Sequence, residues 1–107
     1  MKIEGVWHIS EMEMWDQDYV NIEVRAHITI RAGLTDHFQF GLVQGQMDGK
    51  IVEYSNGGKY EFTWEGTDEG DYLHGTGWLR MKHEDIVEGE FKIHFGDNST
   101  FLAKRAE

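Results

Sequence analysis

Residues 20–31 read VNIEVRAHITIR, and apolar and polar side chains alternate along the whole stretch. Successive side chains of a β-strand point to opposite faces, so a period of two gathers each kind on one face. The apolar set is Val20, Ile22, Val24, Ala26, Ile28 and Ile30. This pattern predicts a strand with one buried face and one solvated face.

Seven further stretches repeat the two-residue period. They are residues 3–9, 38–42, 51–54, 60–64, 73–81, 87–95 and 101–105. Turn signals at 31–33, 48–49, 55–58, 82–85 and 96–98 are short enough for hairpins, which join antiparallel neighbours. The predicted fold is therefore all-β, a single antiparallel eight-stranded meander barrel, in which closure removes the edge strands.

Residues 10–13 interrupt the alternation with SEME, the pattern of a helix capping box. In this motif the Ser10 hydroxyl accepts the backbone N–H of Glu13, and the Glu13 side chain reaches back to the cap. Met12, Trp15 and Tyr19 follow at spacings that share one helical face. The sequence thus predicts one short helix between the first and second strands.

The chain has 107 residues, and twenty acidic against ten basic side chains give a net charge of −10. This length suits one domain, which we expect to span residues 1–107. The negative field repels phosphate backbones and anionic lipids, so we expect no nucleic-acid and no membrane partner. Cysteine is absent and the first ten residues contain no apolar run, which favours a cytoplasmic protein.

The interior of an eight-stranded barrel is filled by side chains or holds one small ligand. The predicted inward face is rich in aromatic residues, which favours a filled core. It consists of Ile3, Trp7, Ile9, Val20, Ile22, Val24, Ile28, Phe38, Phe40, Leu42, Phe62, Trp64, Leu79, Phe91, Ile93 and Phe101. Gly75, Gly77 and Gly89 share this parity, where they either leave a notch or let the strands bend.

Gly5-Val6-Trp7 in the first stretch, with Lys104 and Arg105 in the last, resembles the G-x-W pattern of the lipocalins. In that family the tryptophan packs against a basic residue of the final strand. The expected helix is similar in position to the helical lid of the fatty-acid-binding proteins. The resemblance implies a closed, lipocalin-like barrel with one capped mouth, and it transfers no ligand.

Along nearly its whole length the chain resembles a family of small, uncharacterised prokaryotic proteins of about this length, and four longer blocks carry the resemblance. The blocks are WHISEMEMWDQDYVN from Trp7, FQFGLVQGQMDG from Phe38, EFTWEGTDEGD from Glu61 and HFGDNSTFLAKR from His94. This resemblance implies a single domain and brings no catalytic residue to the chain.

Aromatic and carboxylate side chains at the predicted barrel mouth form the candidate ligand site. They are Trp15, Asp16, Tyr19, Trp64, Glu65 and His94. Such a mouth favours a cationic or sugar-like ligand over an anion. The six histidines lack metal-ligand spacing, and the acidic hairpin loop at residues 65–71 lacks the EF-hand order, so we predict no metal and no cofactor.

Trp78 has outward parity, and Met47 and Tyr54 are expected on the same outer surface. A contiguous outer patch with an exposed tryptophan is typical of a homodimer or partner interface. The predicted interface residues are Val43, His74, Trp78 and Arg80.

These features favour a non-catalytic cytoplasmic binding protein. We expect it to hold a small ligand at the barrel mouth or a protein partner on its outer face. One alternative is a small barrel enzyme that uses Glu65 or Glu11 as general base, with His94 nearby. Another is an acidic protein that imitates nucleic acid and binds a basic partner.

Overall fold

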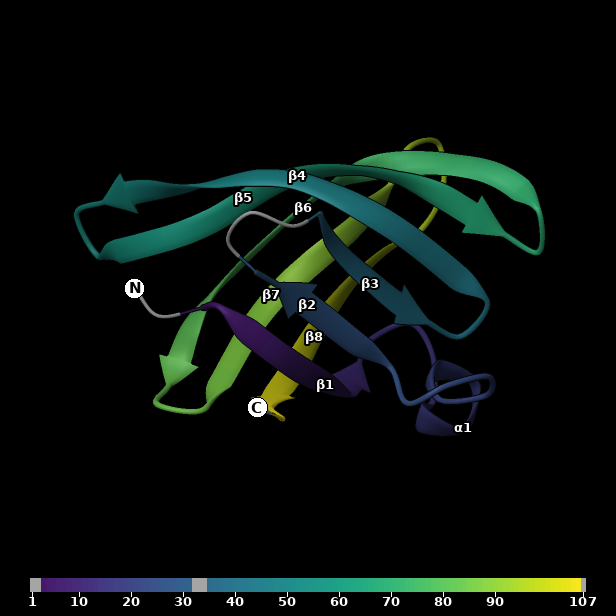
Figure 1. Cartoon of the computed structure of the whole chain (residues 1–107), viewed down its shortest axis with the longest axis horizontal. Coiled ribbons are helices and arrows are strands. Elements are labelled where there is room, and N and C mark those ends of the chain that lie inside the picture. Colours follow the sequence, from purple (N-terminus) through teal and green to yellow (C-terminus); the bar gives the residue numbers. More distant parts are fainter. Residues whose placement is uncertain (1–2, 32–34, 107) are drawn as a thin grey trace.

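A computed structural model describes residues 3–31 and 35–106, and in them it places eight strands and one short helix (Figure 1). The helix is α1 (Gln17–Val20). The strands are β1 (Gly5–Met12), β2 (His27–Ile30), β3 (Asp36–Phe40), β4 (Val43–Tyr54), β5 (Gly57–Asp68), β6 (Asp71–His83), β7 (Ile86–Ile93) and β8 (Asn98–Arg105).

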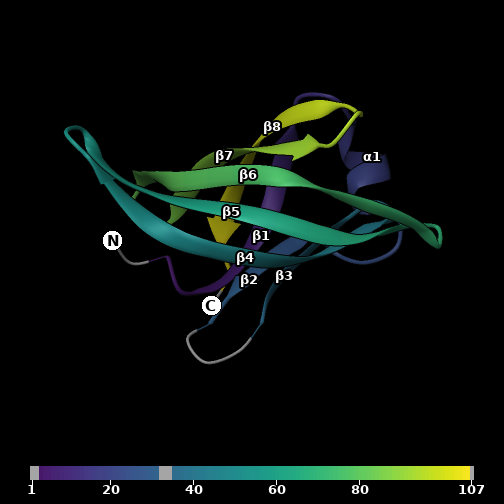
Figure 2. The same cartoon turned by 90° about the horizontal axis from the view of Figure 1, so that it is seen from above.

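The strands close into a barrel in meander order. Each strand pairs antiparallel with the next, and β1 also pairs with β8. The predicted all-β barrel with a short helix between its first two strands is therefore confirmed. Strands β4, β5 and β6 are the longest, and they bow together across one side of the barrel (Figure 2).

The helix begins later than the capping box predicts. β1 continues through Met12 because it pairs with β8, and the Ser10 hydroxyl donates to the Leu102 carbonyl at 3.3 Å. The observed N-cap is Asp16, whose carboxylate accepts the Tyr19 N–H at 3.0 Å. The prediction of a Ser10 cap is wrong, since long-range strand pairing prevails over a local helix signal.

The second strand is shorter than its alternation predicts. Val20 ends α1, and its carbonyl accepts the N–H of Gly41 in the β3–β4 turn. Ile22 and Val24 lie in the connection to β2, where they are 62% and 41% exposed, so their predicted inward placement is wrong. The side-chain oxygen of Asn21 accepts the Ala26 N–H at 2.9 Å, which shapes this connection.

Two predicted turns also differ. The signal at residues 48–49 lies inside β4, which pairs with β5 along its whole length, and the turn after β3 is instead residues 41–42. The acidic segment 65–71 is not a long loop, because β5 runs to Asp68 and only Glu69 and Gly70 form the turn. Both turn residues have positive φ, as a tight hairpin turn requires. Residues 32 and 33 of the turn predicted at 31–33 lie outside the described residues.

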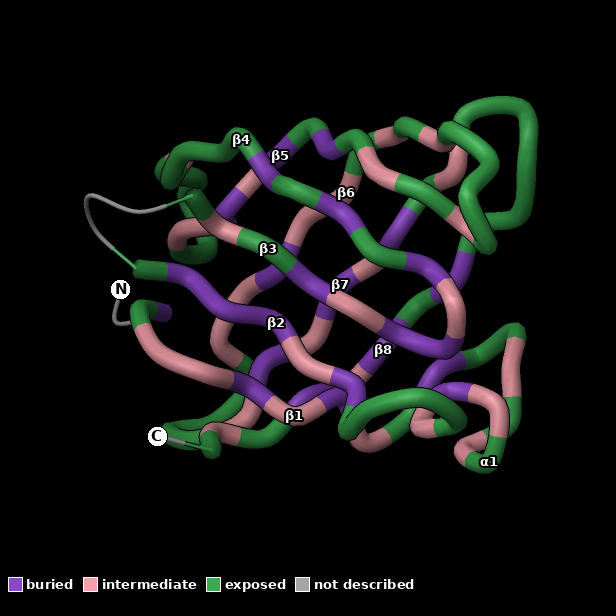
Figure 3. Tube along the Cα trace, turned by 45° about the vertical axis from the view of Figure 1, so that its right-hand side comes forward, coloured by how far each residue is buried: buried purple, intermediate pink, exposed green. Residues whose placement is uncertain are grey.

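Side chains fill the barrel. Buried and exposed positions alternate along the strands (Figure 3). The Phe91 ring centroid lies 4.5 Å from that of Phe38 and 4.8 Å from that of Phe101. Leu42 and Ile93, predicted to face inward, are only half-buried. The buried core also includes Met12, Ala26, Ile30, Val43, Met47, Tyr60, Val87 and Ala103.

Aromatic rings cover several of the inward-facing glycines. A Cβ added to Gly45 would lie 2.5 Å from the Phe38 ring, and one added to Gly89 would lie 2.7 Å from the Phe101 ring. The Phe62 ring lies over Gly77 in the same way. The space that a side chain would occupy at Gly45, Gly77 and Gly89 is therefore filled by aromatic rings and is not an empty notch.

Both ends of the barrel are covered. At the α1 end, Trp15 packs on Phe40 with ring centroids 5.2 Å apart, and the Tyr19 ring lies against Gly41. At the other end, the Arg105 guanidinium lies 4.2 Å from the Trp7 ring centroid. The contact between tryptophan and basic residue that the lipocalin resemblance implies is thus present.

Candidate binding groove

The outer face of the barrel carries three adjoining depressions, which we call the outer groove. Their volumes are about 520, 570 and 500 Å³, and neighbouring depressions share lining residues. The first and second share Gln46, Glu65 and Tyr72, and the second and third share Asp48, Thr63 and Thr76. The groove therefore follows the bow of β4, β5 and β6 without a break.

A row of polar side chains crosses the strands of this face. His37 on β3 is the cross-strand partner of Gln46, Gln46 of Glu65, and Glu65 of His74. The row ends at His94, whose backbone N–H donates to the His74 carbonyl at 2.8 Å. Cross-strand partners point to the same face with their Cβ atoms about 5 Å apart. The side chains of the row therefore present donors and acceptors together.

Tyr72 stands at the junction of the first two depressions. It is 64% exposed, and its hydroxyl donates to the Glu65 carboxylate at 3.1 Å. Desolvation by its neighbours, this hydrogen bond and the charge of Glu65 raise the pKa of Tyr72 above its ordinary value. The phenol is therefore a hydrogen-bond donor to Glu65, and its exposed ring remains accessible at the junction.

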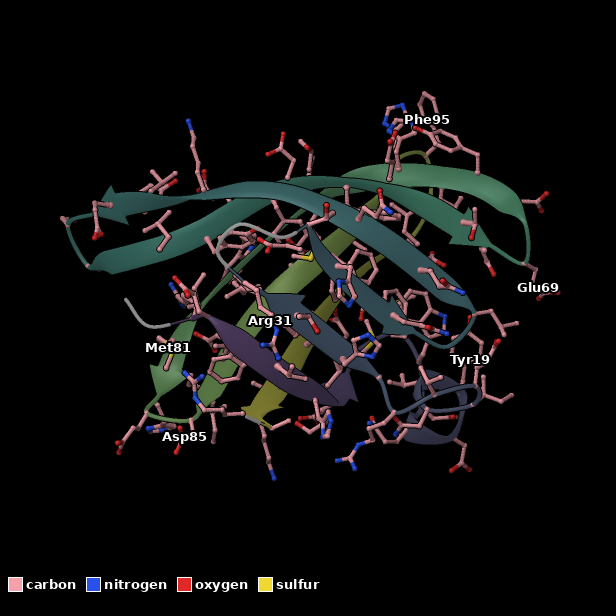
Figure 4. The ribbon with its side chains drawn as sticks, in the orientation of Figure 1. Tyr19, Arg31, Glu69, Met81, Asp85 and Phe95 are labelled. Carbon is pink, nitrogen blue, oxygen red and sulfur yellow. The ribbon has the colours of Figure 1, made fainter. Side chains whose placement is uncertain are left out.

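An exposed aromatic cluster continues from Tyr72. His74 lies 5.6 Å from Tyr72 and 4.6 Å from His94, and His94 lies 4.0 Å from Phe95, all between ring centroids. Phe95 is 99% exposed, has a positive φ of 61°, and points away from the barrel (Figure 4). Phe95 lies in the turn between β7 and β8, so its positive φ belongs to the reversal of the chain, as at Glu69, and the turn presents its ring to solvent.

Trp78 lines the third depression, but its outward position has a local explanation. The Lys59 ammonium lies 4.4 Å from the Trp78 ring centroid, and the Arg80 guanidinium carbon lies 5.4 Å from it. Arg80 in turn forms an ion pair with Glu88 at 2.9 Å. The side chains of Lys59 and Arg80 thus cover part of the Trp78 ring, which is half-buried within the chain itself.

The structure separates the predicted ligand residues into two groups. Trp64, Glu65 and His94 all line the second depression, although Trp64 does so from the buried side, with its indole N–H donating to the Thr76 carbonyl at 3.3 Å. Trp15, Asp16 and Tyr19 lie instead at α1.

Glu11, the other candidate base, lies on β1 opposite Leu102 of β8. Glu11 is not among the groove's lining residues. The six residues predicted for the mouth are divided between α1 and the second depression, so they do not surround one mouth.

The residues predicted for the outer interface lie on both faces of the barrel wall. Val43, Gly45 and Met47 alternate along β4 and share its inward face. Val43 and Met47 are therefore buried core residues, and the prediction that they face outward is wrong. His74 and Trp78 do lie on the outer face, in the second and third depressions.

The groove residues that the sequence did not identify include His37, Gln44, Gln46 and Tyr72. Their outward parity within β3, β4 and β6 is the signal that identifies them. That signal becomes readable only when the 41–42 and 69–70 turns fix where each strand begins.

Among residues 3–31 and 35–106, no group of three or more His, Asp or Glu side chains is arranged to hold a metal ion. In the same part of the chain, no helix has the length and apolar character needed to cross a membrane.

Comparison with models of protein families, with curated proteins and with solved structures finds no match to this chain. The likeness to the lipocalins therefore holds at the level of the eight-stranded antiparallel barrel.

Proposed function

We propose that this chain is a non-catalytic binding protein that acts through the outer groove. The observation that carries this proposal is the contrast between the two faces of the sheet. The inner face is packed with aromatic and aliphatic side chains, and both barrel ends are covered. The outer face offers three connected depressions with polar groups and an exposed aromatic cluster.

Each depression has the volume of a small-molecule site, and few polar groups are needed to orient a ligand in one. Exposed aromatic side chains beside such groups mark interaction sites on soluble proteins. We therefore expect the ligand on the outer wall of the barrel and not at its mouth.

The proposal is tested by mapping a library of small, chemically diverse fragments onto the ¹⁵N-labelled protein by NMR. We expect fragment hits to shift the amide signals of Gln46, Glu65 and Tyr72. The indole signal of Trp7, which is fully buried and does not line the groove, reports on entry into the barrel. Hits that move this indole signal and leave the groove amides unchanged overturn the proposal.

A blocking variant sharpens the test. Gln46→Arg places a long side chain on the wall that the first two depressions share, and we expect it to remove the fragment shifts. His83→Arg is the matched control, because His83 is exposed at the far end of β6. Equal loss in both variants counts against the groove.

A further inference from the structure

We propose, resting on the proposed function, that the ligand of the outer groove is a neutral linear oligosaccharide. The inference depends on three properties of the groove, which are its hydrogen-bonding groups, its exposed rings and its extended shape.

The first two depressions differ in charge from the third, which is lined by Asp48, Lys50 and Glu61. Amide, imidazole and hydroxyl side chains dominate the first two depressions, and no lysine or arginine is found among their described lining residues. Examples are Gln39, Gln44, Gln46, His37, His74 and Thr67. Amides offer two donors and an acceptor, and hydroxyls offer both roles, so they match the hydroxyl groups of a sugar.

Charge argues against an anionic ligand. The chain carries a net charge of −10, and the carboxylates of Asp48 and Glu65 lie in the groove itself. Lys50, the cross-strand partner of Glu61, lines the third depression, and Lys92, the cross-strand partner of Thr76, lies at the margin of the groove. A phosphate or a polyanion would meet repulsion here.

The groups of the groove also match a cationic peptide poorly. Lysine and arginine side chains only donate hydrogen bonds, so they would leave the amide and hydroxyl donors of the first two depressions without acceptors. A polyhydroxylated chain can share the Glu65 carboxylate with Tyr72, because a carboxylate has several acceptor positions.

The exposed rings suit the apolar faces of sugar rings. Tyr72 is 64% exposed and is joined by His74 and His94 to Phe95, which is almost fully exposed. An aromatic ring combines a large apolar face with few rotatable bonds, so it gives contact area at low entropic cost.

The shape of the groove suits a chain rather than a single compact molecule. Three depressions of about 500 to 570 Å³ follow one another and share walls. Successive sugar units of one oligosaccharide can occupy successive depressions, and the open outer face lets the chain enter and leave.

Isothermal titration calorimetry and amide NMR shifts test the inference with a defined panel. The neutral members are cellohexaose, maltohexaose, xylohexaose, mannohexaose and chitohexaose. Hexagalacturonate supplies an anionic chain and hexa-arginine a cationic one. We expect at least one neutral hexasaccharide to bind and to shift Gln46, Glu65 and Tyr72, with both charged chains weaker.

Two tyrosines provide a matched pair of variants. The hydroxyls of Tyr72 and Tyr54 each donate to a glutamate of β5, and both rings are exposed, but Tyr54 is not among the groove's lining residues. We expect Tyr72→Ala to weaken oligosaccharide binding on the order of tenfold and Tyr54→Ala to leave it unchanged. Tyr72→Phe keeps the ring and should retain most of the affinity.

Several results overturn the inference. They are binding of hexa-arginine in preference to every neutral chain, equal loss in the two alanine variants, or no binding of any neutral hexasaccharide at millimolar concentration. If fragments bind in the groove but no oligosaccharide binds, this inference is wrong and the proposed function still holds. If neither fragments nor oligosaccharides bind in the groove, both the inference and the proposed function are wrong.

Discussion

The guanidinium carbon of Arg105 lies 4.2 Å from the ring centroid of Trp7, so the final strand of the barrel covers the tryptophan of the first. Trp7 is fully buried, and its indole N–H donates to the Ile3 carbonyl at 2.8 Å. Arg105 also donates to the Glu4 carbonyl at 2.9 Å and to the Asp85 carboxylate at 3.2 Å. One side chain thus ties the N-terminal segment to β8 and to the β6–β7 turn.

Replacing this arginine should loosen the end of the barrel. Arg105→Met keeps an apolar stem but loses the cation–π contact and the hydrogen bonds, for an expected loss of about 1–3 kcal/mol in the free energy of unfolding. Urea denaturation followed by tryptophan fluorescence measures the loss. Lys104→Met, at the exposed neighbouring position, is the control. Equal stability of the two variants would mean that the Trp7 contact adds nothing.

The barrel could be predicted because its signals are local and repeated. Eight stretches with a period of two, separated by turn residues, leave few arrangements other than an antiparallel meander. The helix start could not be predicted from the same local evidence. Ser10 has a helix-capping sequence, but β8 pairs with β1 as far as Met12, and only the fold brings those strands together. Asp16 caps the helix in its place.

The candidate site was predicted only in part for a related reason. Glu65 and His94 were identified by residue type, and the structure places both in the second depression. Gln46 and Tyr72 have no motif and are found only through the strand register. Side chains alternate between faces, so a misplaced turn changes the face of the residues that follow; the turn expected at 48–49 lies at 41–42, and Val43 faces inward.

The close approach of Gly45 and Phe38 gives a second test of the structure. Because a Cβ at Gly45 would lie 2.5 Å from the Phe38 ring, Gly45→Ala should displace that ring. We expect a loss of about 1–3 kcal/mol in unfolding free energy, typical of overpacking in a well-filled core. Chemical denaturation provides the measurement.

A double variant separates the ring contact from a general effect of alanine in β4. Phe38→Leu shortens the side chain that faces Gly45, so the combined variant should lose less stability than the sum of the two single variants. Additive losses would show that the Phe38 ring is not what requires glycine at this position.

Tyr60 should make the barrel sensitive to alkaline pH. Tyr60 is buried, and its hydroxyl donates to Asp36, whose carboxylate also accepts the Arg31 N–H. Burial first, then this hydrogen bond and the charges of Asp36 and Asp48, raise the pKa of Tyr60 well above its ordinary value of 10.0. Above pH 10 the unfolded chain releases this proton while the folded chain keeps it, so the free energy of unfolding falls as pH rises.

Tyr60→Phe removes this contribution, because phenylalanine has no proton to release. At pH 7 the variant should be less stable by about 1 kcal/mol, since one hydrogen bond to a carboxylate is lost. The deficit should shrink as pH rises above 10, because only the wild type is destabilised by ionisation of residue 60 in the unfolded state. Urea midpoints at pH 7, 9, 10 and 11 measure this trend. Parallel curves for the two proteins would contradict a raised pKa at Tyr60.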